Sequence, residues 1–229
     1  MVGGSSLGTI QTNARRGAMM LLALAVVCWP STTFAQVPGA CATPVSERTG
    51  PVGYYTDSNE VLGELPKAPI FWHMYNYPTR DAAESARPSH GTVVEAFGKI
   101  WLYAIATADW HPSSGRRVAV IGPLLIPTKK SYTARYLEAV FTPGMRAHAH
   151  EHSGPEAFYV VSGTQYLETS DGMTLSHPGE SAVAPEGSFM TVKGVGGETR
   201  RALVVVLHDS SQPWQTLTDD WTPKGLCPT

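Results

Sequence analysis

The sequence predicts an all-β fold, an antiparallel sandwich or small barrel, on the strength of three observations. Between residues 92 and 208, short runs rich in β-branched and aromatic residues follow one another at even spacing. Turn residues divide these runs, most clearly Ser170-Asp171-Gly172 and Pro178-Gly179. No segment between the runs has a convincing helical period. Together these features are typical of sandwiches and small barrels.

The first 35 residues have the pattern of a signal peptide. Arg15 and Arg16 precede an apolar run over residues 18–29, and Thr33-Phe34-Ala35 places small residues where a signal peptidase cleaves. The apolar run is shorter than the roughly 18 to 20 residues that a transmembrane helix needs, and no later stretch reaches that length. We therefore expect cleavage after Ala35 and a periplasmic or secreted protein without a membrane segment.

The rest of the chain divides by composition into three parts. Residues 36–91 are rich in Pro, Gly, Ser and Thr, which predicts an irregular N-terminal arm that wraps the domain. Residues 92–210 are predicted to form the barrel, and residues 211–229 a C-terminal tail. The expected strands are 92–97, 99–106, 117–124, 133–141, 156–162, 164–169, 181–184, 188–193 and 201–208. The last of these is apolar on both faces, as a buried central strand would be.

The stretch HAHEHSGPE, residues 148–156, places three histidines at every second position before a glutamate. Alternate side chains of a strand share one face, so His148, His150 and His152 are expected to point the same way. Gly154 and Pro155 then turn the chain and bring the Glu156 carboxylate alongside. Two imidazoles and a carboxylate can share one divalent ion and leave coordination positions for other ligands. The sequence thus predicts a metal site at His150, His152 and Glu156; the alternative is a polar network without metal.

The spacing of these residues resembles the first sequence motif of the cupin superfamily. That motif is matched throughout by Gly144, His150, His152, Glu156 and Gly163, and the second motif in part by Gly179, Pro185 and Gly187. The resemblance implies a jelly-roll β-barrel with a metal near its centre, often in a homodimer. It does not identify a reaction, because the fold hosts oxygenases, isomerases, lyases and non-catalytic binding proteins.

The chain departs from the second motif at two positions. Met190 stands where cupins usually supply a fourth ligand histidine, and Gly194 stands where they have an asparagine. A thioether suits Cu(I) better than Fe(II), so Met190 is expected to pack at the pocket wall. The three remaining ligands are of the type used by non-haem iron oxygenases. We therefore expect a divalent transition metal, Fe(II) before Mn, Ni, Zn or Cu.

Other residues are candidates for the pocket around the ion. Phe158 and Val160 share strand parity with Glu156 and are expected to line the cavity. His208 ends the last core strand and is a further candidate, although a histidine in this place is usually structural. His148 lies at the predicted barrel mouth, where proton handling or substrate contact is its expected role and substitution for the fourth ligand the alternative.

The mature chain keeps two of the three cysteines, Cys41 near its start and Cys227 near its end. An even pair in an oxidising compartment predicts one disulfide that ties the termini together, the alternative being two unpaired thiols. Without Arg15 and Arg16, 15 basic residues face 19 acidic ones, a formal charge of about −4. No basic stripe remains that would indicate nucleic-acid binding.

Three functions agree with these features. The first is a metal-dependent oxygenase that acts on a small organic molecule at His150, His152 and Glu156. The second is a non-redox metal enzyme, an isomerase or lyase, in which the ion polarises a carbonyl group. The third is a non-catalytic exported cupin that binds a small molecule or sequesters metal. The oxygenase is the favoured hypothesis by a small margin.

Overall fold

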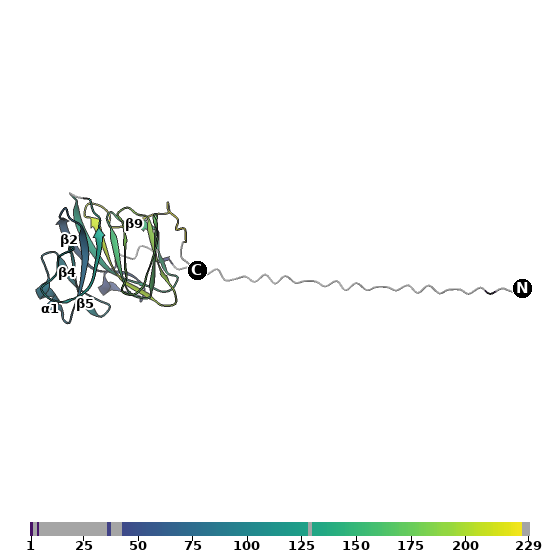
Figure 1. The fold of residues 1–229 in the computed structure, drawn as a ribbon, viewed down its shortest axis with the longest axis horizontal. Helices are drawn as coiled ribbons and strands as arrows, with labels where there is room; N and C mark the ends of the chain where they lie inside the picture. Colours follow the sequence, from purple (N-terminus) through teal and green to yellow (C-terminus); the bar gives the residue numbers. More distant parts are fainter. Residues whose placement is uncertain (2–3, 5–35, 38–42, 128–129, 226–229) are drawn as a thin grey trace. The chain divides into compact units, whose positions relative to one another are not determined.

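The computed structural model describes residues 1, 4, 36–37, 43–127 and 130–225 (Figure 1). Most of the predicted signal peptide, and both Cys41 and Cys227, lie outside these residues. From residue 36 onward the described chain belongs to one compact unit. No helix among the described residues is both long and apolar enough to cross a bilayer.

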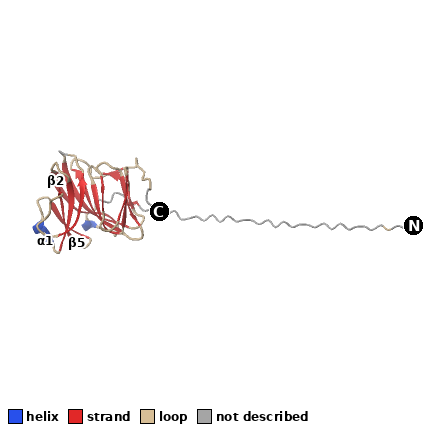
Figure 2. Ribbon diagram, viewed as in Figure 1, coloured by secondary structure: helices blue, strands red, loops and turns tan. Residues whose placement is uncertain are grey.

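Three sheets make up this unit, and strands dominate it (Figure 2). We name them by their content as the histidine sheet, the central sheet and the arm sheet. The histidine sheet has the order β1 (Gln36–Val37), β8 (Arg146–Ala147), β14 (Met190–Val195), β11 (Thr164–Thr169), β12 (Gly172–Ser176), with β9 (His150–Glu151) between β14 and β16 (Thr216–Leu217). The central sheet has the order β13 (Ser181–Ala184), β10 (Glu156–Ser162), β15 (Arg200–Asp209), β7 (Ser131–Phe141), β2 (Gly53–Glu64). The arm sheet has the order β4 (Gly91–Ala96), β5 (Lys99–Thr107), β3 (Ile70–Tyr77), β6 (Arg116–Leu124). The helices are η2 (Val45–Glu47) and α1 (Arg80–Ala86).

The strand order in two of these sheets is that of a jelly roll. Counting β7, then β8 with β9, then β10 to β15 as strands one to eight, the central sheet contains the order 6-3-8-1 and the histidine sheet the order 2-7-4-5. Two facing sheets with this interleaving are the double Greek key of a jelly roll. The predicted all-β class is confirmed.

The central sheet is the middle layer of three. Alternate residues of β15 point to opposite sides, and each side has its own apolar cluster. Leu203, Val205 and Leu207 pack in a cluster with the arm sheet. Val204 and Val206 pack in a second cluster with the histidine sheet. Because both faces of β15 are covered, its apolar run is that of a buried central strand, as predicted.

The structure corrects the expectation of an irregular arm. Within residues 36–91, β2 adds an edge strand to the central sheet and β3 lies between β5 and β6 in the arm sheet. The alternation of β2 is obscured because its register shifts at two places, between Thr56 and Ser58 and between Val61 and Gly63. In Figure 1 β2, β4, β5 and α1 lie together, so the boundary expected at residue 92 passes through one sheet.

The C-terminal part of the chain also has a defined place. Within the predicted tail, β16 pairs with β9, and the amide of Thr218 donates to the carbonyl of Ala149. The Ser153 hydroxyl donates to the carbonyl of Pro213. We call residues 213–218 the C-terminal strap, because this segment runs along the strand and turn that carry the histidines.

Candidate metal centre

A strand, a turn and the start of a second strand place the three predicted ligands. His150 lies on β9, His152 follows it, and Glu156 opens β10. Gly154 in the turn approaches β15 so closely that an added Cβ would lie 1.8 Å from the carbonyl oxygen of Leu207. The Leu207 amide donates to the Pro155 carbonyl at 3.0 Å. Only glycine permits this approach, which begins β10 directly beside the histidines.

The structure brings His150, His152 and Glu156 together. One ligand atom of each lies within 4.8 Å of those of the other two. Nε2 of His152 is 3.1 Å from Oε2 of Glu156, and Nε2 of His150 is 4.0 Å from the same oxygen. The three residues are only 2%, 4% and 3% exposed. A single ion can therefore contact all three groups in a site nearly closed to solvent.

Main-chain carbonyls orient both imidazoles. Nδ1 of His150 lies 2.7 Å from the oxygen of His148, and Nδ1 of His152 lies 2.5 Å from the oxygen of Trp214. A carbonyl oxygen only accepts, so each Nδ1 carries the proton and each Nε2 presents a lone pair. Histidines that bind metal are commonly held in this way through the other ring nitrogen.

The residues fit a metal ion because their buried polar atoms are incompletely paired. Among the described residues, Nε2 of His152 and Oε2 of Glu156 make no hydrogen bond of good geometry. Burial, and then the neighbouring His152, lower the pKa of His150 to about 4, so this imidazole is neutral at pH 7. Burial also opposes the charge of His152, but the Glu156 carboxylate outweighs it and raises the pKa of His152. A divalent ion held by these residues would occupy the Nε2 position in place of a proton and would compensate the buried carboxylate.

Backbone contacts of the motif glycines connect the two sequence motifs around this centre. The Gly187 amide donates to the His152 carbonyl at 3.0 Å, and the Gly144 amide donates to the Gly194 carbonyl at 2.8 Å. Gly163 has a φ of +68°, and an added Cβ would lie 2.8 Å from the main chain of Arg200. At Gly194 a Cβ would lie 2.9 Å from the Thr142 carbonyl oxygen, which explains why asparagine is absent there.

The chain is similar over part of its length to solved structures. A cupin-like protein from Thermotoga maritima has a TM-score of 0.35 and 16% identity, over 37% of this chain and 64% of that protein. A protein with a double-stranded β-helix domain from Klebsiella pneumoniae has a TM-score of 0.34 and 20% identity, over 44% of this chain and 80% of that one. A DMSP lyase from Ruegeria pomeroyi matches at 0.34 and 17%, over 40% of this chain and 45% of the lyase. No protein-family model and no curated protein matches the sequence.

The two facing sheets have the strand order of a jelly roll, the fold that the sequence resemblance implies. The contacts of the motif glycines agree with that resemblance. The matched structures assign this chain no reaction.

His148 does not join the other two histidines. The alternation expected over residues 148–152 is interrupted, because β8 ends at Ala147 and β9 begins at His150. His148 is half-buried, and its Nε2 lies 3.4 Å from Oδ1 of Asp219, which is exposed. Both line a cavity of about 190 Å³ together with Arg146, Thr191 and Trp221. The structure thus places the expected catalytic candidate beside the C-terminal segment, apart from the three ligands.

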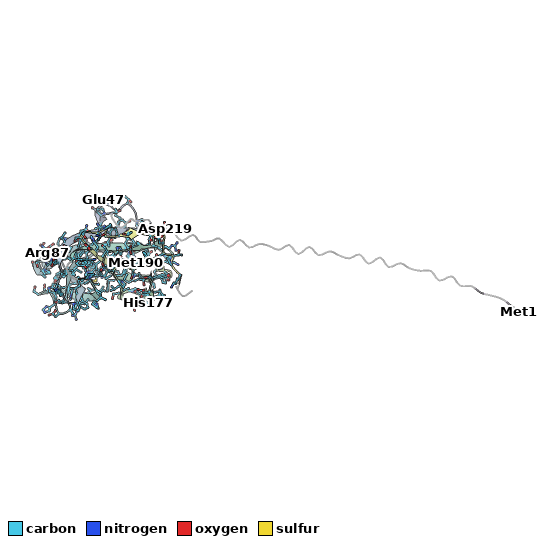
Figure 3. The ribbon with its side chains drawn as sticks, turned by 90° about the horizontal axis from the view of Figure 1, so that it is seen from above. Met1, Glu47, Arg87, His177, Met190 and Asp219 are labelled. Atoms are coloured by element: carbon cyan, nitrogen blue, oxygen red, sulfur yellow. The ribbon has the colours of Figure 1, made fainter. Side chains whose placement is uncertain are left out.

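The predicted pocket residues lie on β10, β14 and β15 of the jelly roll. Phe158, Val160 and Met190 are at most 1% exposed, and Met190 lies directly across from His150 in the pairing of β14 with β9. Figure 3 shows Met190 among the inner side chains and Asp219 nearer the rim. His208 is half-buried at the end of β15, and burial lowers the pKa of its imidazole. The nearest open cleft, about 230 Å³, is lined by His152, Glu186, Pro213 and Thr216.

Two residues of this region are absent from the sequence-based prediction. Trp214, in the strap, orients His152 through its carbonyl and stacks on the same imidazole at 5.7 Å between ring centroids. The guanidinium of Arg135 covers the other side of the Trp214 ring at 4.4 Å. Arg200 lies inside the jelly roll and is 0% exposed. Neither residue stands in a motif, and only contacts between distant segments reveal them.

Proposed function

We propose that this chain is an exported, metal-dependent enzyme that acts on a small organic molecule, with an oxygenase of the non-haem iron type as the favoured reaction class. The observation that supports the proposal is the convergence of two oriented imidazoles and a carboxylate in a closed, largely apolar interior. A divalent ion bound there supplies Lewis acidity and, as Fe(II), one-electron redox chemistry. Three protein ligands leave room for a substrate to bind as a further ligand.

Different residues have different roles in this proposal. His150, His152 and Glu156 would hold the ion through Nε2, Nε2 and a carboxylate oxygen. The carbonyls of His148 and Trp214 fix the direction of the two imidazoles. The strap and the Trp214 ring keep water from one side of His152. His148, whose imidazole faces Asp219, remains the candidate for moving a proton or contacting substrate near the strap.

Metal analysis tests the ligand assignment. We expect about one equivalent of metal in the purified protein, and its loss in His150→Ala and Glu156→Gln, each verified as folded by circular dichroism. His177→Ala is the matched control, because His177 is exposed and lies in a turn between β12 and β13. A wild-type protein without stoichiometric metal, or ligand variants that keep it, would contradict the proposal.

A second measurement separates the reaction classes. Oxygen consumption driven by a panel of phenolic and diketone compounds, lost in Glu156→Gln, is the result expected for an oxygenase. Turnover that persists without oxygen, with zinc or manganese in the site, would instead support the isomerase or lyase alternative. Tight binding of a compound without any product would support the non-catalytic alternative.

A further inference from the structure

Arg200 is a buried arginine without an ionic partner in the part of the chain that the structure describes. Its side chain is 0% exposed at the start of β15. In the described part of the chain, no carboxylate lies within 4.0 Å of the Arg200 guanidinium. Burial of an unpaired charge costs several kcal/mol, so arginines in this position are normally paired with an acid. A negative group beside Arg200 would offset this cost.

The immediate contacts of Arg200 leave its charge unmatched. Nε donates to Oε1 of Gln165 at 3.0 Å, and Nη2 donates to the same oxygen. The phenol of Tyr54 interacts with the guanidinium, and the rings of Phe141 and Phe158 lie 5.1 and 5.8 Å from it. None of these groups is a carboxylate. Nη1 of Arg200 and Nε2 of Gln165 make no hydrogen bond of good geometry within the described chain.

These two donors belong to residues that are already in contact, because Oε1 of Gln165 accepts from the guanidinium. A carboxylate accepts two parallel hydrogen bonds and neutralises a guanidinium. Arginine is also the residue best suited to such planar recognition, since its fork of donors is rigid and always charged. An inorganic cation, an amine or a neutral ligand would leave the buried charge uncompensated.

Arg200 faces the same interior as the metal centre. On β15 it shares strand parity with Val204 and Val206, which pack between the central and histidine sheets. The Phe158 ring lies 5.8 Å from the Arg200 guanidinium. Phe158 is two residues after Glu156 on β10, so the two side chains point to the same face of the sheet. Burial lowers the pKa of the Arg200 guanidinium, and Tyr54 and then the Glu156 carboxylate oppose this shift electrostatically.

We propose that Arg200 and Gln165 form an anion subsite, and that the substrate is a small organic carboxylate whose acid group binds there while another part of the molecule faces His150, His152 and Glu156. The assignment of substrate class depends on the proposed function. Binding of the carboxylate itself does not, because the donors of this subsite are present with or without metal.

Binding of propionate by the full mature chain tests the subsite, measured calorimetrically with metal-free and with zinc-loaded protein. Propionamide, which has the same shape without the charge, serves as the neutral probe. We expect propionate to bind both forms, propionamide to bind at least about tenfold more weakly, and Arg200→Met to weaken propionate binding at least about tenfold. Arg201→Met is the matched control, because Arg201 is the exposed neighbour and should leave binding unchanged.

The stability of the variants separates this role from a purely structural one. Arg200→Met should melt at the same temperature as the wild type or higher, because it removes a buried charge. If that variant does not fold, Gln165→Glu replaces it in the test. A glutamate at position 165 would pair with Arg200, so propionate binding should be lost in this variant too. Propionate binding that persists in the folded variant would overturn the subsite.

Each remaining outcome has a distinct meaning. Propionate that binds only the zinc-loaded protein, with equal affinity in Arg200→Met, would place the carboxylate on the metal alone and overturn the inference. Failure of the wild type to bind propionate in either form would overturn it as well. Binding to a protein that takes up no metal would contradict the proposed function and leave the anion subsite supported.

Discussion

The two histidines of the metal centre differ in how the rest of the chain holds them. His150 is oriented by a carbonyl two residues away, whereas His152 is oriented by Trp214, 62 residues later. The Trp214 ring also stacks on His152 and is covered by Arg135. Such supporting contacts tune metal sites because they fix the ring and exclude water. At the residue scale, Trp214 is therefore the supporting residue whose loss should matter most.

Trp214→Leu should lower the affinity for zinc roughly tenfold, measured by competition with a coloured chelator. The substitution keeps the main-chain carbonyl but removes the ring that shields and aligns His152. Trp110→Leu is the control, because Trp110 contacts His73 and Tyr75 in a different part of the chain. Equal zinc affinity in Trp214→Leu and the wild type would show that the carbonyl alone orients the histidine.

Asp57 predicts how stability depends on pH. Burial, and then the nearby Glu138 carboxylate, raise the pKa of Asp57 from 3.8 to about 8, while Arg48 opposes the shift. Neither oxygen of Asp57 has a hydrogen-bond partner among the described residues. The folded protein holds this proton more tightly than the unfolded chain does. Its stabilising effect is therefore complete below the unfolded pKa and is lost as the pH rises through about 8.

The free energy of unfolding should fall between pH 4 and pH 8, by up to about 1.4 kcal/mol per pH unit. Asp57→Asn should flatten this profile and be more stable than the wild type at pH 8.5, because the amide never acquires a charge. Urea unfolding at several pH values measures both effects. Asp171→Asn, at an exposed hairpin turn, should leave the profile unchanged. A flat wild-type profile would refute the expectation.

At the scale of elements, the centre depends on a very short strand and a tight turn. β9 has two residues, yet it has β14 on one side and β16 on the other. The turn after it is held against β15, where the Asp209 and Leu207 amides donate to the Ser153 and Pro155 carbonyls. Position 154 is therefore where a small change in the backbone should affect both stability and metal binding.

Gly154→Ala should destabilise the protein by at least about 2 kcal/mol, because the new methyl group collides with the main chain of β15 and no side chain can move aside. The folded fraction should also bind zinc more weakly, since β10 can no longer begin in its present place. Thermal unfolding and zinc titration measure the two effects. Gly50→Ala is the control, because nothing lies within 4 Å of its added Cβ. Wild-type stability in Gly154→Ala would mean that the turn tolerates a shift.

At the scale of the whole molecule, β15 lies between two apolar clusters that are lined by different kinds of side chain. Tyr103, Tyr136 and Trp72 fill the side toward the arm sheet with mutually packed rings. The other side contains the candidate ligands, Arg200 and Gln165. The arm sheet thus covers one face of the central sheet, while the candidate ligands lie between the two sheets of the jelly roll.

The predicted signal peptide and the predicted disulfide between Cys41 and Cys227 can be tested together on the exported protein. Protein recovered from the periplasm or medium should have the mass of residues 36–229 and no free thiol by a colorimetric thiol assay. Reduction should lower the melting temperature, because a long closed loop stabilises by up to about 5 kcal/mol. Cys227→Ser should melt like the reduced wild type. Two reactive thiols in the unreduced protein would contradict the predicted bridge.

Local patterns were sufficient for most of the jelly-roll strands and for the candidate ligand set, although β12 was not among the predicted strands. The strand over residues 201–208 and the hairpin at Asp171 follow from alternation and turn chemistry between neighbours in sequence. The arm was misjudged because β2 carries two register shifts, which disrupt the alternation that identifies a strand. His148 was expected to share a face with the other histidines, but the strand is interrupted between Ala147 and His150.

The sequence by itself determined the all-β class and the three candidate ligands, because turns, alternation and the spacing within residues 148–156 act over a few bonds. The tertiary structure decided which groups support those ligands. Trp214 reaches His152 from the strap, and Gln165 meets Arg200 from the opposite sheet. Such contacts depend on which faces are buried together, and burial is a property of the packed layers rather than of any single segment.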